Sequence, residues 1–172
     1  MVTIRNNERK TEDIVRDHFR KYLEDIVLEE QISDNPKINK ILSNASKSGS
    51  GRGSPEFIVQ FKKNSDLLII VECKADTRKH ESKNRDLYKG YAIDGSLLYS
   101  SYLSKEFDVL SIAVSGQNER ELKVSHFLQL KGEKKAVEKF SNKLLSSEDY
   151  LQGYLKSPEK FKQDYDKLLS FS

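Results

Sequence analysis

The chain has 172 residues, of which 36% are hydrophobic and 33% are charged, and its formal net charge is +3. This length predicts one compact domain with a buried core, and so small a net charge is only weak support for nucleic-acid binding. The single cysteine, Cys73, excludes an internal disulfide and is typical of a reducing compartment. The sequence shows neither the apolar run of a signal peptide nor a stretch of membrane-spanning length. We therefore expect a cytoplasmic protein with no membrane partner.

The first third of the chain combines helical and strand patterns and ends in a loop rich in Gly and Ser. That loop lacks the Gly-Lys-Ser/Thr ending of a phosphate-binding P-loop, so we expect a flexible segment and not a nucleotide site. In chain order the pattern predicts a helix over 8–23 with Asn7 or Thr11 as its cap, a strand over 26–31, a helix over 36–45 and the loop over 46–54.

A β-hairpin is predicted next. Its strands cover 57–61 and 67–71, a polar turn at 63–66 joins them, and the second strand ends in Glu72-Cys73-Lys74. Successive strand residues point to opposite faces, so the carboxylate and the ammonium of this tripeptide share one face, and the thiol is a core group on the other. Pairing of the strands brings Glu56, which precedes the first one, towards Glu72.

Two carboxylates and a lysine around one point suit a divalent metal and a water that attacks a phosphodiester. The acidic-x-Lys spacing alone proves little, because it occurs four more times in the chain. Only Glu72-Cys73-Lys74 closes an apolar run, where charged groups must be paired, bound to metal or functional. A plain ion pair between Glu72 and Lys74 is the structural alternative.

Pro55-Glu56 followed by Glu72-x-Lys74 resembles the PD-(D/E)xK nucleases, with Glu in place of the usual Asp. A longer series of motifs resembles the N-terminal endonuclease domain of restriction enzymes that are fused to an adenine-specific DNA methyltransferase, namely type IIG enzymes and type I-like relatives. The resemblance covers about residues 8–132. The series comprises Asn44-Ala-Ser-Lys-Ser-Gly-Ser-Gly-Arg-Gly-Ser-Pro-Glu-Phe, Val71-Glu-Cys-Lys-Ala-Asp, Lys79-His-Glu-Ser-Lys-Asn-Arg-Asp, Tyr91-Ala-Ile-Asp-Gly and Ser115-Gly.

The resemblance implies a restriction-endonuclease-like α/β fold and a type II-like, site-specific deoxyribonuclease. It implies Mg²⁺, for which Mn²⁺ can substitute, bound by Glu56, Glu72 and the backbone carbonyl of Cys73. Lys74 would orient the water and stabilise the developing charge. A carboxylate on the first helix would assist, and Glu12 is the choice, with Glu8 as the alternative.

Beyond Lys74 the sequence predicts a polar loop and a helix whose Tyr91 lacks the Gln that often precedes it by four residues in restriction subunits, because Leu87 stands there. The strands that follow would extend a mixed β-sheet flanked by helices. The predicted elements are the loop over 77–84, a helix over 85–102 broken or bent near Asp94 and Gly95, strands over 107–114 and 123–130, and helices over 133–145 and 158–169.

The patterns place a boundary at Gly132, and the resemblance then implies a nuclease domain over 1–132 and a helical extension or linker over 133–172, toward the methyltransferase. The partners implied are double-stranded DNA, methyltransferase and target-recognition parts of the same longer polypeptide or complex, and a transient dimer for double-strand cleavage. No segment carries a helix-turn-helix or zinc-finger signature, so specific recognition is expected elsewhere. The side chains expected to contact DNA, chiefly its phosphates, are Lys47, Ser48, Arg52, His80 and Lys83.

Two other functions fit the same residues. A structure-selective nuclease, such as a Holliday-junction resolvase, uses the same chemistry, but the long series of restriction-enzyme motifs argues against it. A non-catalytic DNA-binding module with the same fold is the second alternative. The presence of Glu56, Glu72 and Lys74 argues against that, because a site without activity would be free to lose them.

Overall fold

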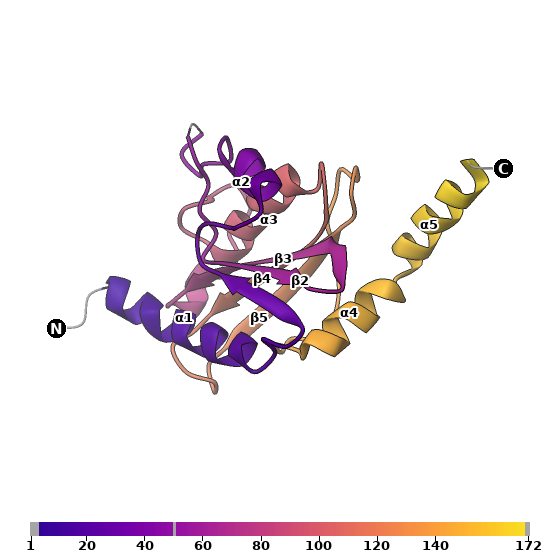
Figure 1. Ribbon diagram of the computed structural model, residues 1–172. Coiled ribbons are helices and arrows are strands. Elements are labelled where there is room, and N and C mark those ends of the chain that lie inside the picture. The colour runs from indigo at the N-terminus through magenta and orange to yellow at the C-terminus, as the bar shows by residue number, and fades with distance from the viewer. Residues whose placement is uncertain (1–3, 50, 171–172) are drawn as a thin grey trace.

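The computed structural model describes residues 4–49 and 51–170. In chain order its elements are α1 (Ile4–Arg20), β1 (Ile26–Glu29), α2 (Pro36–Leu42), β2 (Phe57–Phe61), β3 (Asn64–Lys74), the 3-10 helix η1 (Thr77–Lys79), α3 (Ala92–Leu103), β4 (Asp108–Ser115), β5 (Lys123–Gln129), β6 (Val137–Glu138), α4 (Ser147–Leu155) and α5 (Pro158–Ser170). The described strands form one six-stranded sheet in the order β1-β2-β3-β4-β5-β6. β3 and β4 are parallel, and the other neighbouring pairs are antiparallel. The predicted α/β fold, a mixed sheet flanked by helices with a C-terminal helical extension, is confirmed and is consistent with a restriction-endonuclease-like core (Figure 1).

The sheet separates two layers of helices. α1 and α4 pack on one face, where Ile69, Val71 and Cys73 of β3 join their core. α2 and α3 pack on the other face, against Leu68 and Ile70. Side chains two residues apart on a strand share a face, so the pleat of β3 directs the next even-numbered residue, at position 72, to the side of α3. The sequence alternation thereby decides which helix layer meets the acidic end of the strand.

The predicted hairpin is confirmed, with a tighter turn than expected. Phe57 pairs with Val71, and at the other end Phe61 pairs with Asn64. The chain therefore reverses at residues 62–63, and the predicted turn residues 64–66 already belong to β3.

The predicted helix over 85–102 is wrong in its first part, because α3 begins only at Ala92. The cause is Asp94, which is fully buried and accepts hydrogen bonds from the backbone N–H of Ser82 and of Leu87 and from the hydroxyl of Ser82. These bonds hold the preceding segment in a loop. Leu87, which lies in this part of the predicted helix, is 54% exposed. α3 also continues through Gly95 without the predicted break.

The predicted helix over 133–145 is also wrong. Val137 and Glu138 instead pair with β5 as the edge strand β6, and a helix that the patterns did not predict, α4, follows. Tyr150 and Tyr154 of α4 are fully buried in the core shared with α1. α5 agrees with the predicted helix over 158–169 and leads away from the sheet (Figure 1). The division of the chain at residue 132 stays a prediction.

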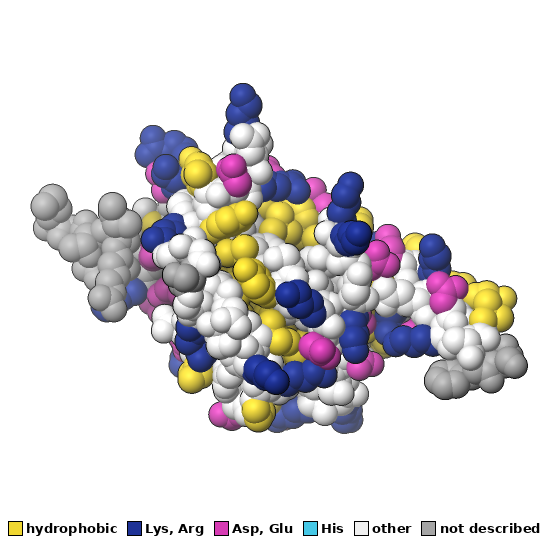
Figure 2. All heavy atoms as spheres, turned by 90° about the horizontal axis from the view of Figure 1, so that it is seen from above, with side chains coloured by type: hydrophobic (Ala, Val, Ile, Leu, Met, Phe, Trp, Pro, Cys, Tyr) yellow, Lys and Arg dark blue, Asp and Glu magenta, His cyan; other side chains and the backbone are white. Residues whose placement is uncertain are grey.

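The surface carries charges of both signs. Figure 2 views the molecule from the side of α2 and α3, and Lys and Arg side chains are scattered there among Asp, Glu and apolar side chains. They do not gather into one basic patch on this face. None of the helices in the described ranges has the length and apolar character needed to cross a membrane.

Candidate active site

The two carboxylates expected at the hairpin lie side by side. Because Phe57 pairs with Val71, Glu56 stands next to Glu72 at the open end of the strands. The backbone N–H of Glu56 donates a hydrogen bond of 2.9 Å to Oε2 of Glu72. Only 2% of Glu72 is exposed. The sequence therefore predicted this juxtaposition correctly.

Glu72 makes its ion pair with Lys47, through Oε1, and not with Lys74. Lys47 comes from the Gly-rich loop, and its side chain is only 18% exposed. Its Nζ also lies 5.5 Å from the centroid of the Tyr99 ring. Burial by itself lowers the pKa of Lys47, but the charge and hydrogen bond of Glu72 outweigh it, so that the pKa is raised. The prediction that Lys47 contacts phosphate did not anticipate this buried pair.

Glu56 is crowded by other acids. Its pKa is raised to about 9 by burial, by the neighbouring charge of Glu72, and by a hydrogen bond to Glu12. α1 thus brings Glu12 to the hairpin, as the sequence analysis expected. At neutral pH and without a bound cation, Glu56 therefore holds a proton.

Lys74 lies beside these acids but has its own partners. Its Nζ is 3.4 Å from Oε1 of Glu8 and donates a 2.8 Å hydrogen bond to the carbonyl of Lys89. Glu8 and Glu12 are one helical turn apart on α1 and so share a face. Glu8 contacts Lys74 and Glu12 contacts Glu56, which means that the two candidates on the first helix reach different members of the site.

Thr11 fixes the position of α1 over the sheet. The prediction that Thr11 or Asn7 caps this helix is wrong, because both residues lie inside it. Thr11 is fully buried, and its hydroxyl is 2.5 Å from the carbonyl of Gly116 and 3.4 Å from that of Lys74. The Thr11 hydroxyl, predicted to cap the helix, instead joins α1 to the ends of β3 and β4.

Gly95 explains how α3 approaches the site. A Cβ atom at this position would lie 2.9 Å from the carbonyl oxygen of Tyr88, 3.0 Å from Cε of Lys47 and 3.1 Å from Oε1 of Glu72. Glycine in a helix interior costs about 1 kcal/mol relative to alanine, so it needs a packing or functional reason. Here the reason is the close approach of the Tyr88 carbonyl and of the Lys47–Glu72 pair. Gly95 is the one sequence signal for this contact, although it was predicted to mark a break or bend in the helix.

The remaining residues expected to contact DNA fall into two groups. Ser48, Arg52 and Lys83 are exposed, and Arg52 also donates to the carbonyl of Gln31 over 3.3 Å. His80, expected on an exposed loop, is instead 8% exposed. Its ring nitrogens contact the hydroxyls of two serines, and burial together with the charge of Lys123 lowers its pKa to about 4. The serine contacts are 2.7 Å to Ser115 and 2.8 Å to Ser125.

The carboxylates supply the oxygen donors that Mg²⁺ prefers. In the described ranges, however, no group of three or more His, Cys, Asp or Glu side chains is arranged to hold a metal ion. Both oxygens of Glu72 are engaged, by Lys47 and by the N–H of Glu56. The thiol of Cys73 is buried among apolar side chains of the α1 layer, so it adds no ligand here. The carboxylate oxygens fit a divalent cation, and one of them, Oε1 of Glu72, is occupied by the ammonium of Lys47.

Comparison with known proteins gives one informative match. Over 127 residues the chain is 35% identical to the type II restriction enzyme and methyltransferase RM.BcgI of Heyndrickxia coagulans. The likeness supports a restriction-enzyme-like family. The matched residues are 64% of this chain and 19% of the relative, so the chain spans about a fifth of that protein. No family model and no solved structure matches the chain.

Proposed function

We propose that this chain is a metal-dependent DNA endonuclease domain of a restriction-modification enzyme, with the PD-(D/E)xK site at the open end of the β2–β3 hairpin. One observation carries the proposal: Glu56 and Glu72 lie side by side next to Lys47, with Glu12 near Glu56, in a chain similar to a restriction enzyme. So many acids at one partly buried point are costly for folding, and such clusters occur where function requires them.

The chain's own residues divide the work. Glu56, Glu72 and the backbone carbonyl of Cys73 would hold Mg²⁺ or Mn²⁺, which supplies Lewis acidity and makes a water more acidic. Lys74 reaches the same end of the strand and can stabilise charge that develops on the phosphate. Glu12 lies close enough to Glu56 to raise the pKa of that carboxyl and would assist there.

The partners follow from the relative and from the surface. Double-stranded DNA is the substrate, and a methyltransferase part belongs to the same polypeptide or complex, as the name of the relative suggests. The resemblance described under Sequence analysis adds a target-recognition part. The face drawn in Figure 2 mixes charges, so the domain alone should bind duplexes weakly, without preference for sequence and with strong dependence on salt.

The experiment is a plasmid-nicking assay with Mg²⁺, with Mn²⁺ and with EDTA. The wild-type domain should nick only with a cation. Lys74→Met should lower the rate by about 10²- to 10³-fold, the usual loss for one donor to transition-state charge. Lys63→Met is the matched control, because Lys63 is exposed in the turn at the far end of the hairpin, and its rate should be unchanged. Equal nicking by wild type and Lys74→Met, or nicking in EDTA, would remove the case for this site.

A further inference from the structure

A lysine outside the Glu-x-Lys motif lies in the site. The ammonium of Lys47 pairs with Oε1 of Glu72, although 25 positions of sequence separate them. Its surroundings are specific to it: Gly95 leaves room for Cε, and the Tyr99 ring lies 5.5 Å from Nζ. Tyr99 is itself held, because its hydroxyl accepts the backbone N–H of Ser54 over 3.2 Å. Lys47 therefore occupies a built position between α3 and the acidic end of β3.

The ammonium of Lys47 balances the charge of the buried Glu72 carboxylate. An isolated carboxylate as deeply buried as Glu72 is unfavourable unless a cation accompanies it. Lys47 supplies one positive charge at an oxygen that the proposed function assigns to a divalent ion. Two cations at one carboxylate oxygen would repel each other at short range. Lys47 and the divalent ion therefore compete for Glu72.

The loop allows Lys47 to leave. Its base is tied by backbone hydrogen bonds from Ser46 N–H to Gly51 O, 3.0 Å, and from Gly49 N–H to Ser46 O, 3.1 Å. Gly49 and Gly51 have positive φ angles of 89° and 94°, and a Cβ on either would meet no atom within 4 Å. Open space therefore surrounds the loop at Gly49 and Gly51. Four flexible methylenes carry the ammonium, so it can turn outwards while the loop base stays in place.

We propose that Lys47 is an internal counter-cation: it holds Glu72 while the site lacks a metal, and it leaves when a divalent cation binds. The proposal rests on the proposed function, because it assumes that Glu72 is a metal ligand. It adds a role for Lys47 that the Glu-x-Lys motif does not contain. Once released, the ammonium is beside the cation and available to a DNA phosphate.

The test measures cation binding without DNA. Calorimetry measures the binding of Mn²⁺ and of Mg²⁺ to four proteins: wild type, Lys47→Met, the distant control Lys63→Met and the ligand variant Glu72→Gln. The melting temperature of each protein is recorded with and without cation. Lys47→Met should melt below wild type in EDTA and bind Mn²⁺ about tenfold more tightly, which equals 1.4 kcal/mol of removed competition. Lys63→Met should match wild type, and Glu72→Gln should lose the binding.

A second measurement needs no variant. In wild-type protein with ¹⁵N-labelled lysine, the Lys47 ammonium should be protected from exchange with solvent in EDTA and lose that protection when Mg²⁺ is added. The replacement of Lys47 by the cation is overturned if protection persists at saturating Mg²⁺, or if Lys47→Met binds Mn²⁺ no more tightly than wild type does. Either result leaves the proposed nuclease function intact. If wild type binds neither cation, the proposed function fails together with this replacement.

Discussion

At the scale of single residues, the two hairpin carboxylates should affect stability in opposite ways. Glu56 is an acid forced to keep its proton by burial and by the charge of Glu72, whereas Glu72 has a cationic partner in Lys47. Without divalent cations, Glu56→Gln should therefore raise the melting temperature. Glu72→Gln should lower it, because it leaves the buried ammonium of Lys47 without its carboxylate.

The gain from Glu56→Gln should depend on pH. The pKa of Glu56 is about 9 in the folded chain and near 4.5 when unfolded, so the folded state binds more protons between these values. The contribution of Glu56 to the unfolding free energy of wild type is fully present below pH 4.5, and it is lost as the pH rises towards 9. Thermal melts in EDTA should show the advantage of Glu56→Gln growing from pH 5 to pH 9. A constant difference would mean that Glu56 titrates normally, and Glu119→Gln, at an exposed position, serves as the control.

The residues of the site differ in how far the sequence could reveal them. Glu56, Glu72 and Lys74 could be predicted because strand alternation and hairpin pairing are local rules, and the structure confirms that the two carboxylates are neighbours. Lys47 could not be placed, because its contact depends on how a loop without a periodic pattern packs against α3. His80 appeared exposed because its neighbours are polar, while its two serine partners lie on β4 and β5.

At the scale of elements, the errors have a common cause. Helix periodicity was assigned to 85–91 and to 133–145, but contacts with residues outside each segment override it in both. Hydrogen bonds to Asp94 hold residues 85–91 in a loop, and pairing with β5 makes Val137 and Glu138 the strand β6. α4 was not predicted, although the sequence carries two signals for it. Ser146 accepts a hydrogen bond from the N–H of Asp149 as an N-cap, and the buried residues Tyr150 and Tyr154 are four positions apart. Local propensity is a weak guide where a tertiary partner exists.

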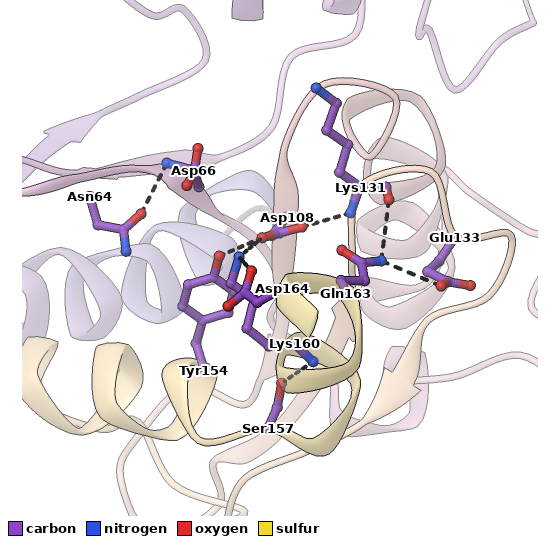
Figure 3. Close-up of polar contacts among 10 residues, drawn as sticks. All are labelled: Asn64, Asp66, Asp108, Lys131, Glu133, Tyr154, Ser157, Lys160, Gln163 and Asp164. Atoms are coloured by element: carbon purple, nitrogen blue, oxygen red, sulfur yellow. Dashed lines mark hydrogen bonds and ion pairs between the residues drawn. The ribbon is translucent and has the colours of Figure 1, made fainter. Parts of the chain in front are cut away.

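The junction between α4 and α5 depends on a buried ionic network at the start of β4 (Figure 3). Asp108 accepts the hydroxyl of Tyr154 and, over 2.7 Å, the backbone N–H of Lys131. The ammonium of Lys160 lies 3.4 Å from Asp108 and 3.2 Å from Asp164, and Lys160 is 7% exposed. The network therefore fixes the first turns of α5 to the sheet.

We expect Lys160→Met to cost about 3 kcal/mol of unfolding free energy, because it leaves the buried carboxylate of Asp108 without its cation. Hydrogen exchange in α5 should accelerate, since the helix loses its polar attachment to β4. Denaturant melts and exchange measurements would show this, with Lys162→Met, exposed on the same helix, as control. Equal stability of the two variants would mean that apolar packing alone holds the junction.

At the scale of the whole molecule, one chain offers one candidate site, while a duplex has two strands of opposite polarity. A single set of Glu56, Glu72 and Lys74 can be aligned with one phosphodiester at a time. Cutting both strands at one place then requires a second copy of the domain, or release and rebinding in the opposite orientation. These two routes differ in their dependence on protein concentration.

We predict that double-strand cleavage uses two copies. At low concentration the domain should give nicked circles, and the rate of linear product should rise more steeply than in proportion to protein, because two weakly bound copies must meet on one duplex. Adding the inactive Glu72→Gln variant to a fixed amount of wild type should then slow linearisation more than nicking, since mixed pairs cut one strand only. Linear product that rises in strict proportion to protein, without a nicked intermediate, would contradict this prediction and would indicate that one copy cuts both strands before it leaves the DNA.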